Sequence, residues 1–253
     1  MPTLNQYKME EPDQNQTEVT ENQEEIQGDL VEESLEDDLG VDIPDIPLPS
    51  SEEFEETLVE DEFQGAYKFA VVGVGQGGSR LAETFWKLGY RRVAVINTAA
   101  QDLKPISVPE ANKLLIGGSG AGKDRKVANG IFEEHREDIL DFLKKVFTSN
   151  IDRVLVCIGA GGGTGAGGGP VVVDICHDLC ETFGVEKERK DARVGAVLAL
   201  PSKSEGSRVK NNAKETAEAL IEYSMDNTLS PLIILDNERI KHLYPKLSVN
   251  KFW

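Results

Sequence analysis

The sequence has few residues of the kinds that build disulfide frameworks or metal centres. Its 253 residues include three cysteines and three histidines. Three cysteines are too few for a secreted fold held together by several disulfide bonds. Cys157 lies in an apolar run and is predicted to be a core residue, whereas Cys176 and Cys180 are one helical turn apart with His177 beside them. A small apolar helix face explains this spacing better than a zinc site, which needs more ligands at closer spacing. We therefore predict no metal site built from protein ligands and a reducing compartment, the cytoplasm.

Long apolar runs are also missing. No segment approaches about 18 consecutive apolar residues, so no transmembrane helix is expected. The first residues are acidic rather than basic and no apolar stretch follows them, which argues against a secretory signal peptide.

Basic residues are nearly absent from the first quarter of the chain. Residues 1–66 hold 22 of the 45 acidic residues and one basic residue, Lys8, so they carry a formal charge of −21 and the remainder carries +3. The composition therefore lacks the excess of basic residues that is typical of a nucleic-acid-binding surface. Residues 1–64 contain few large apolar side chains and are predicted to form a disordered acidic tail. Two stretches, 43–48 and 54–63, are interpreted either as solvated parts of this tail or as docking motifs for a basic partner.

Residues 65–253 are predicted to form one domain in which strands and helices alternate. We expect strands at 68–72, 92–97, 112–116, 152–158, 193–200 and 231–235, and helices at 79–88, 126–147, 170–183 and 212–223. Gly130 is a candidate interruption of the second helix, and Pro170 is expected in the first turn of the third. The alternation predicts an α/β fold, a Rossmann-like three-layer arrangement with a mainly parallel sheet and helices on both faces.

The first expected strand is followed by a glycine-rich loop, residues 73–78, with the sequence GVGQGG. Glycines allow backbone N–H groups to approach phosphate oxygens at the start of a helix. The spacing also fits the dinucleotide fingerprint, which requires an acid after the second strand to bind the ribose. Asn97, Thr98 and Ala99 stand there instead. An NAD-dependent oxidoreductase therefore stays only as a disfavoured alternative.

A second glycine-rich loop, residues 117–124, has the sequence GGSGAGKD. It nearly matches the Walker pattern, but Asp124 replaces the Ser or Thr whose hydroxyl would bind Mg²⁺, and a carboxylate there would repel phosphate. We interpret this segment as a loop that donates N–H groups to a terminal phosphate rather than as a P-loop.

A third glycine-rich loop, residues 159–170, contains eight glycines and lies between an apolar strand and a helix. Flexible linkers do not usually join such elements. Close N–H donors and a helix dipole are what a diphosphate or triphosphate requires, so this loop is predicted to bind the phosphates of such a ligand.

These loops, taken together with other segments in the same order, resemble the FtsZ/tubulin family. GGGTGAG at 161–167 resembles its signature, and INTAAQDL at 96–103, PSKSEG at 201–206 and LDNERI at 235–240 resemble other family segments. The resemblance runs from about Lys68 to Trp253 and implies the tubulin/FtsZ nucleotide-binding domain. It also implies GTP or GDP as ligand, with Mg²⁺ as an accompanying ion.

The resemblance assigns roles to particular residues. The α- and β-phosphates would contact Gly75, Gln76, Gly77 and Gly78. The phosphates would be held from the other side by Gly162, Gly163, Thr164 and Gly165. The γ-phosphate would approach Ala121 and Gly122. Glu205 would accept hydrogen bonds from the ribose, and Asn237 would contact guanine.

Three positions depart from the family pattern. Arg80 stands where the family has an asparagine that helps to bind the base. Ala99 replaces an aspartate near the metal and γ-phosphate. Val209 occupies the place of the family arginine, and Arg208, one residue earlier, is the candidate substitute. These changes leave phosphate binding intact but weaken the case for guanine and for Mg²⁺ geometry.

The resemblance also implies a cytoskeletal GTPase that assembles head-to-tail into filaments or with a related FtsZ-like subunit. In the family, hydrolysis uses a catalytic loop from a neighbouring subunit. The chain stops at Trp253, so we expect the C-terminal activation domain to be absent and assign no catalytic residue. The alternative function is a non-hydrolysing nucleotide-binding regulator or capping protein of such filaments.

Overall fold

The computed structural model describes residues 68–148, 151–184 and 193–246. The predicted acidic tail, 1–64, lies outside these residues, as does the end of the chain from 247. Within the described ranges, no helix is long and apolar enough to span a membrane.

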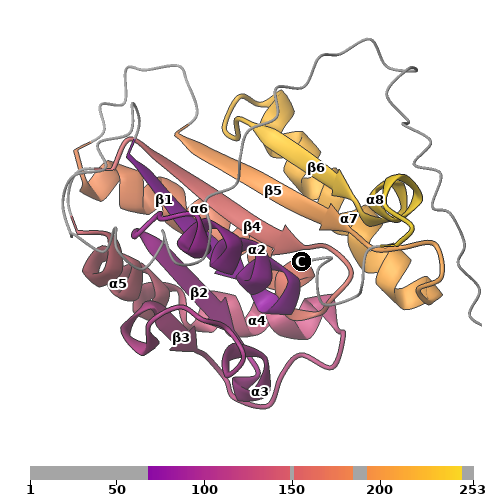
Figure 1. The fold of residues 1–253 in the computed structure, drawn as a ribbon. Coiled ribbons are helices and arrows are strands. Elements are labelled where there is room, and N and C mark those ends of the chain that lie inside the picture. The colour runs from indigo at the N-terminus through magenta and orange to yellow at the C-terminus, as the bar shows by residue number, and fades with distance from the viewer. Residues whose placement is uncertain (1–67, 149–150, 185–192, 247–253) are drawn as a thin grey trace, which may run out of the picture. The chain divides into compact units, whose positions relative to one another are not determined.

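The described residues contain a six-stranded sheet in which every neighbouring pair is parallel. Its strand order is β3-β2-β1-β4-β5-β6 (Figure 1). The strands are β1 (Phe69–Val74), β2 (Val93–Asn97), β3 (Lys113–Leu115), β4 (Arg153–Gly159), β5 (Val194–Leu200) and β6 (Leu232–Asp236). The predicted mainly parallel sheet is confirmed.

The helices cover both faces of this sheet, as expected from the β–α alternation. They are α2 (Gly75–Lys87), α3 (Ala100–Leu103), α4 (Arg125–Glu134), α5 (Arg136–Phe147), α6 (Thr164–Thr182), α7 (Ser207–Met225) and α8 (Asn237–Leu243), with a short 3₁₀ turn at Glu110–Asn112.

Side chains alternate between two hydrophobic cores because successive residues of a strand point to opposite faces. Val156 of β4 lies in a core with residues of α4, α5, α6 and α7, whereas its neighbour Leu155 lies in a second core with residues of α2. β1, β4 and β5 are almost wholly buried. Strands covered on both faces have the continuous apolar runs seen in the sequence.

The long helix expected at 126–147 is two helices, and the break is at His135 rather than at Gly130. Glu137 and Asp138 lie in the first turn of α5, where carboxylates are stabilised by the helix dipole. The His135 Nδ1 atom lies 2.9 Å from Asp138 Oδ2. The acidic pair therefore favours a new helix start at this point.

The helix expected to begin at Pro170 begins at Thr164, so Pro170 lies inside α6 rather than in its first turn. Proline lacks the N–H that would bond the carbonyl of Ala166. The Thr216 hydroxyl from α7 instead lies 3.2 Å from the Ala166 oxygen. The second half of the third glycine-rich loop is therefore helical.

Candidate functional site

The loops singled out in the sequence follow strands that end at one edge of the sheet. β1 and β4 are neighbours at the centre of the sheet, with β2 on one side and β5 on the other. The chain leaves β1 toward β2 and leaves β4 toward β5, so this is the point where the strand order reverses. Ligands of open α/β sheets bind at such a switch point, beyond the carboxyl ends of the strands.

Two helices begin side by side at this switch point. α2 starts directly after β1 and α6 starts just after β4, and neither has a side-chain cap. Gly75 has a φ of +70°, and a Cβ atom built on it would lie 2.7 Å from the backbone nitrogen of Gly165. Only glycine allows these two helix starts to approach so closely. The first residues of α2 and α6 thus place the N–H groups of two helix starts side by side.

Other glycines of these loops fix how the loops lie against the strands. A Cβ at Gly78 would collide with the carbonyl oxygen of Cys157, and one at Gly165 would lie 2.5 Å from the Gly159 oxygen. Gly162 is different, because nothing lies within 4 Å of a Cβ built there. The backbone at Gly162, in the loop before α6, therefore borders open space.

The last glycines of the 159–170 segment serve helix packing instead. A Cβ at Gly167 would collide with the carbonyl oxygen of Arg125, and one at Gly168 would lie 2.5 Å from the Phe132 ring. Both contacts are with α4. Part of the glycine density in the sequence therefore reflects the close approach of α4 to α6 rather than ligand binding.

The loop at 117–124 is shaped by residues with positive φ, namely Gly117, Gly118, Gly120, Gly122 and Lys123. The Gly120 N–H donates to the Thr98 carbonyl at 2.8 Å, so this loop is attached to the end of β2. A Cβ at Gly163 would lie 2.9 Å from the Cβ of Ala121. All three glycine-rich loops are therefore in contact, directly or through a neighbour.

Asp124 does not point a free carboxylate at the loops. Its Oδ1 atom accepts from the N–H groups of Lys126 and Val127, which makes it the N-cap of α4. Its Oδ2 atom accepts from Arg208 at 2.9 Å. The two backbone hydrogen bonds, with a further contribution from Arg208, lower the pKa of Asp124. The carboxylate that argued against a Walker loop is thus a helix cap.

Threonine hydroxyls join the end of β2 to the start of α6. Thr98 Oγ1 and Thr164 Oγ1 lie 2.7 Å apart. Asn97 Oδ1 accepts from the N–H of Thr98 at 2.8 Å and from that of Ala99 at 3.2 Å. The Asn97 Nδ2 atom is buried and has no acceptor among the described residues. Ala99, where the family has an aspartate, is buried beside the 117–124 loop.

The residues assigned to the nucleoside lie after β5 and β6. Glu205 is exposed, and its Oε1 atom accepts from the Ser202 N–H at 2.9 Å. Asn237 is buried as the first residue of α8. The Lys203 N–H donates to Glu238 Oε2 at 2.8 Å, which connects these two loops.

The other candidate residues are placed as follows. Gln76 is exposed in the first turn of α2, and its Nε2 atom lies 3.5 Å from Asp102 Oδ1. Gly77 is half-buried against Gly159, and Gly122 is exposed. Arg80 is half-buried in α2, and no polar contact of its side chain joins it to the other candidates in the described part of the chain.

Arg208, the candidate substitute for the family arginine, is exposed, whereas its neighbour Val209 is buried. Arg208 is engaged with Asp124, and its side chain is 60% exposed. Val209 is buried, and a Cβ at Gly161 would collide with it. Val209 therefore packs beneath the third glycine-rich loop.

One residue at these loops has no assigned role in the sequence motifs. The Asn212 side chain, from α7, contacts backbone carbonyls of two glycine-rich loops. The signal in the sequence is that Asn212 and Thr216 are polar residues on the buried stripe of α7, which also contains Val209, Ala213 and Leu220. Buried polar side chains are normally hydrogen-bonded, so polar residues on such a stripe indicate specific partners.

Cys176, Cys180 and His177 lie in the second half of α6, beyond its glycine-rich start. Cys176 and Cys180 are buried on α6, as predicted for an apolar face. Burial lowers the pKa of His177, and the carboxylates of Asp174 and Asp178 partly oppose that shift. The described residues contain no group of three or more His, Cys, Asp or Glu side chains that could hold a metal ion.

A doubly wound parallel sheet with glycine-rich helix starts at its switch point is the arrangement of phosphate-binding α/β domains. The same strand order occurs in dinucleotide-binding folds, so the fold by itself does not select the family. Residues 68–245 match the model of the Tubulin/FtsZ family, GTPase domain. The chain belongs to the Tubulin/FtsZ family, and the oxidoreductase alternative loses its support.

Proteins from Pyrococcus species are similar in sequence to most of this chain. Cell division protein FtsZ 1 of Pyrococcus furiosus is 29% identical over 214 residues, which cover 82% of this chain and 51% of the relative. Cell division protein FtsZ 2 of the same organism is 33% identical over 206 residues, covering 78% and 46%. The tubulin-like protein CetZ of Pyrococcus abyssi is 31% identical over 178 residues, covering 68% and 45%. The chain spans about half the length of these relatives.

Solved structures share the fold. An empty FtsZ dimer from M. jannaschii has a TM-score of 0.58 and 28% identity, covering 81% of this chain and 54% of that one. The GDP-bound monomer of CetZ1 from Haloferax volcanii has a TM-score of 0.60 and 24% identity, covering 73% and 55%.

Proposed function

We propose that residues 65–253 are the GTP-binding domain of an FtsZ- or tubulin-like cytoskeletal GTPase. The observation that carries this proposal is the contact between Gly75 and Gly165, which brings two uncapped helix starts together at the switch point. The family match supports the choice of guanine nucleotide. A related protein, CetZ1 of Haloferax volcanii, has been solved with GDP.

The backbone of the two helix starts suits a polyphosphate. The N–H groups of Gly75, Gln76 and Gly77 in α2 have no preceding helix carbonyl to bond, and the same holds for the first residues of α6. Helix N-termini carry positive partial charge, which favours bound anions. Glu205 Oε2, which takes no part in the bonds to Ser202, would accept from the ribose, and Asn237 would contact the base.

Magnesium would be bound mainly by phosphate oxygens and water, as it commonly is in nucleotide sites. Ala99 supplies no carboxylate, and the hydroxyls of Thr98 and Thr164 are polar groups close to it. We therefore infer that nucleotide binding depends on Mg²⁺ less strongly than a site with an aspartate at position 99 would.

The binding test replaces Gly162 by a larger residue, which the folded protein can accommodate but which would clash with a bound nucleotide. Gly162→Leu should fold normally because nothing lies within 4 Å of a Cβ built at this exposed residue, yet its side chain would occupy open space beside the proposed phosphate-binding loop. Gly130→Leu, on the exposed face of α4, is the matched control, since its Cβ also has no neighbour within 4 Å. We expect the wild type and Gly130→Leu to bind a fluorescent GTP analogue competed by GTP and GDP but not by ATP or NAD. Equal binding by Gly162→Leu would contradict the assigned site.

Assembly and hydrolysis are further parts of the proposal. CetZ2 of Haloferax volcanii has been solved as a GTPγS-bound protofilament, and we propose head-to-tail self-association for the protein to which this domain belongs. Hydrolysis would require acidic groups from a neighbouring subunit that polarise the attacking water. Binding is therefore expected to be readily measured on this chain, with slow turnover.

A non-hydrolysing regulator or capping protein of such filaments is the second candidate function. The buried Ala99 and Val209, which stand at the family's aspartate and arginine positions, favour it. Sedimentation with GTP distinguishes the two. Nucleotide-dependent pelleting of the chain alone supports an assembling subunit, whereas shortening of a relative's filaments without self-pelleting supports a capping protein.

A further inference from the structure

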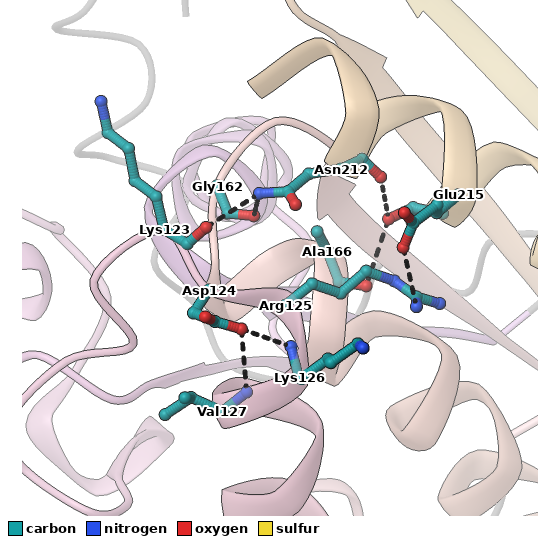
Figure 2. A network of polar contacts seen from close by, with 10 residues as sticks. Lys123, Asp124, Arg125, Lys126, Val127, Gly162, Ala166, Asn212 and Glu215 are labelled. Carbon is teal, nitrogen blue, oxygen red and sulfur yellow. Dashed lines mark hydrogen bonds and ion pairs between the residues drawn. The ribbon is translucent and has the colours of Figure 1, made fainter. Parts of the chain in front are cut away.

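Asn212 joins two glycine-rich loops that are far apart in the sequence. Its Nδ2 atom lies 3.1 Å from the Lys123 carbonyl oxygen and 3.3 Å from that of Gly162 (Figure 2). The Gly161 carbonyl oxygen also lies 3.3 Å from it. The residue is 8% exposed. An amide group has two N–H donors, so three nearby acceptors use its full donor capacity.

These contacts fix the direction of the loop's N–H groups. In a trans peptide unit, the carbonyl of one residue and the N–H of the next point in opposite directions. Because the carbonyls of Gly161 and Gly162 point at Asn212, the N–H groups of Gly162 and Gly163 point away from it. Neither N–H has an acceptor within the described ranges. The loop therefore presents two free donors on the side opposite Asn212, a geometry that binds anions.

Neighbouring contacts hold the same face of α7 against α4. Arg208 lies 2.9 Å from Asp124. Arg125 Nη1 lies 3.4 Å from Glu215 Oε2 (Figure 2). Both ion pairs include a largely exposed partner, and such pairs contribute little. The buried Asn212 amide is therefore the main polar connection of α7 to the 117–124 loop and to residues 159–163, whereas Thr216 connects α7 to Ala166 in α6.

We propose that Asn212 is a positioning residue that orients the 159–163 loop and the 117–124 loop together, and so sets the preference of the site for a nucleoside triphosphate over a diphosphate. This inference rests on the proposed nucleotide binding. In the proposed site only the terminal phosphate of a triphosphate would reach the 117–124 loop, so losing the connection between the loops should affect the triphosphate most.

The test compares two isosteric substitutions that add the same charge. Asn212→Asp removes the N–H donors and keeps the side-chain shape, whereas Asn211→Asp changes an exposed neighbour. For Asn212→Asp we expect GTP affinity to fall about tenfold or more and GDP affinity to fall much less, because one buried hydrogen-bonding group is lost. Asn211→Asp should leave the GTP-to-GDP affinity ratio at the wild-type value.

The affinity ratio separates positioning from stability, since partial unfolding would lower both affinities equally. An unchanged ratio in a folded Asn212→Asp variant overturns the inference while leaving the proposed function intact. Failure of the wild type to bind either nucleotide overturns the proposed function and this inference with it. If Asn212→Asp does not fold, the amide resonances of Gly162 and Gly163 in the ¹⁵N-labelled wild type decide: they should shift more with GTP than with GDP, and equal shifts contradict the inference.

Discussion

The Thr216 hydroxyl lies 3.2 Å from the carbonyl oxygen of Ala166, the one carbonyl of α6 that Pro170 leaves without its helical donor. The same hydroxyl lies 2.7 Å from the Asn212 carbonyl in its own helix. That second carbonyl retains the backbone N–H of residue 216, whereas the Ala166 oxygen has lost its partner. The hydroxyl thus connects α7 to α6 where α6 contains a proline.

Thr216→Val should destabilise the fold by about 1–3 kcal/mol, because it leaves the buried Ala166 carbonyl without a donor. In a Pro170→Ala background the backbone N–H at position 170 can bond Ala166, so the same substitution should cost about 1 kcal/mol less. Urea unfolding of the four proteins measures both effects. Thr182→Val is the control, since its hydroxyl bonds the Asp178 carbonyl on an exposed turn. Additive effects in the cycle would contradict the assigned partner.

Gly167→Ala and Gly130→Ala should shift stability in opposite directions although both place a methyl group in a helix. The new methyl at 167 would collide with the Arg125 carbonyl and lie 2.8 Å from the Ala128 Cβ, so α4 must move away from α6. We expect a loss of about 3 kcal/mol. At 130 nothing lies within 4 Å, and replacing glycine in a helix should add up to about 1 kcal/mol. Denaturant midpoints measure both; a neutral Gly167→Ala would show that the helices are not closely packed there.

Much of this fold could be predicted from local sequence. The runs at 152–158 and 193–200 are continuously apolar because β4 and β5 are covered on both faces. The start of α6 could not be predicted, because glycine disfavours helix by about 1 kcal/mol per residue. The helix forms there because α4 packs against Gly167 and Gly168. The same contrast holds for the site. The glycine-rich loops could be recognised from local sequence, whereas the role of Asn212 depends on loops that are distant from it in the sequence.

The three thiols should be unreactive in the folded protein. Burial raises the pKa of Cys157 to about 12 and that of Cys180 to about 11, with Arg193 partly opposing the shift at Cys180. Burial also raises the pKa of Cys176. Since the thiolate is the reactive form, a disulfide reagent at about pH 8 should modify no cysteine until guanidinium unfolds the chain. An Asn211→Cys variant, with an exposed thiol, controls for reagent activity; rapid loss of native thiols would contradict the buried placement.

The cap that Asp124 provides to α4 should weaken in acid. The N–H groups of Val127 and Lys126, with Arg208, lower its pKa in the folded state below the ordinary value of 3.8. A carboxyl group whose pKa is lower when folded contributes stability that is fully present above the unfolded value and is lost as the pH falls through the folded value. Asp124→Asn keeps a capping oxygen but cannot titrate. The difference in melting temperature between wild type and Asp124→Asn should therefore be constant from about pH 7 to 5 and shrink below about pH 4. Parallel melting curves across the whole range would show that the carboxylate does not stabilise the start of α4 through its charge.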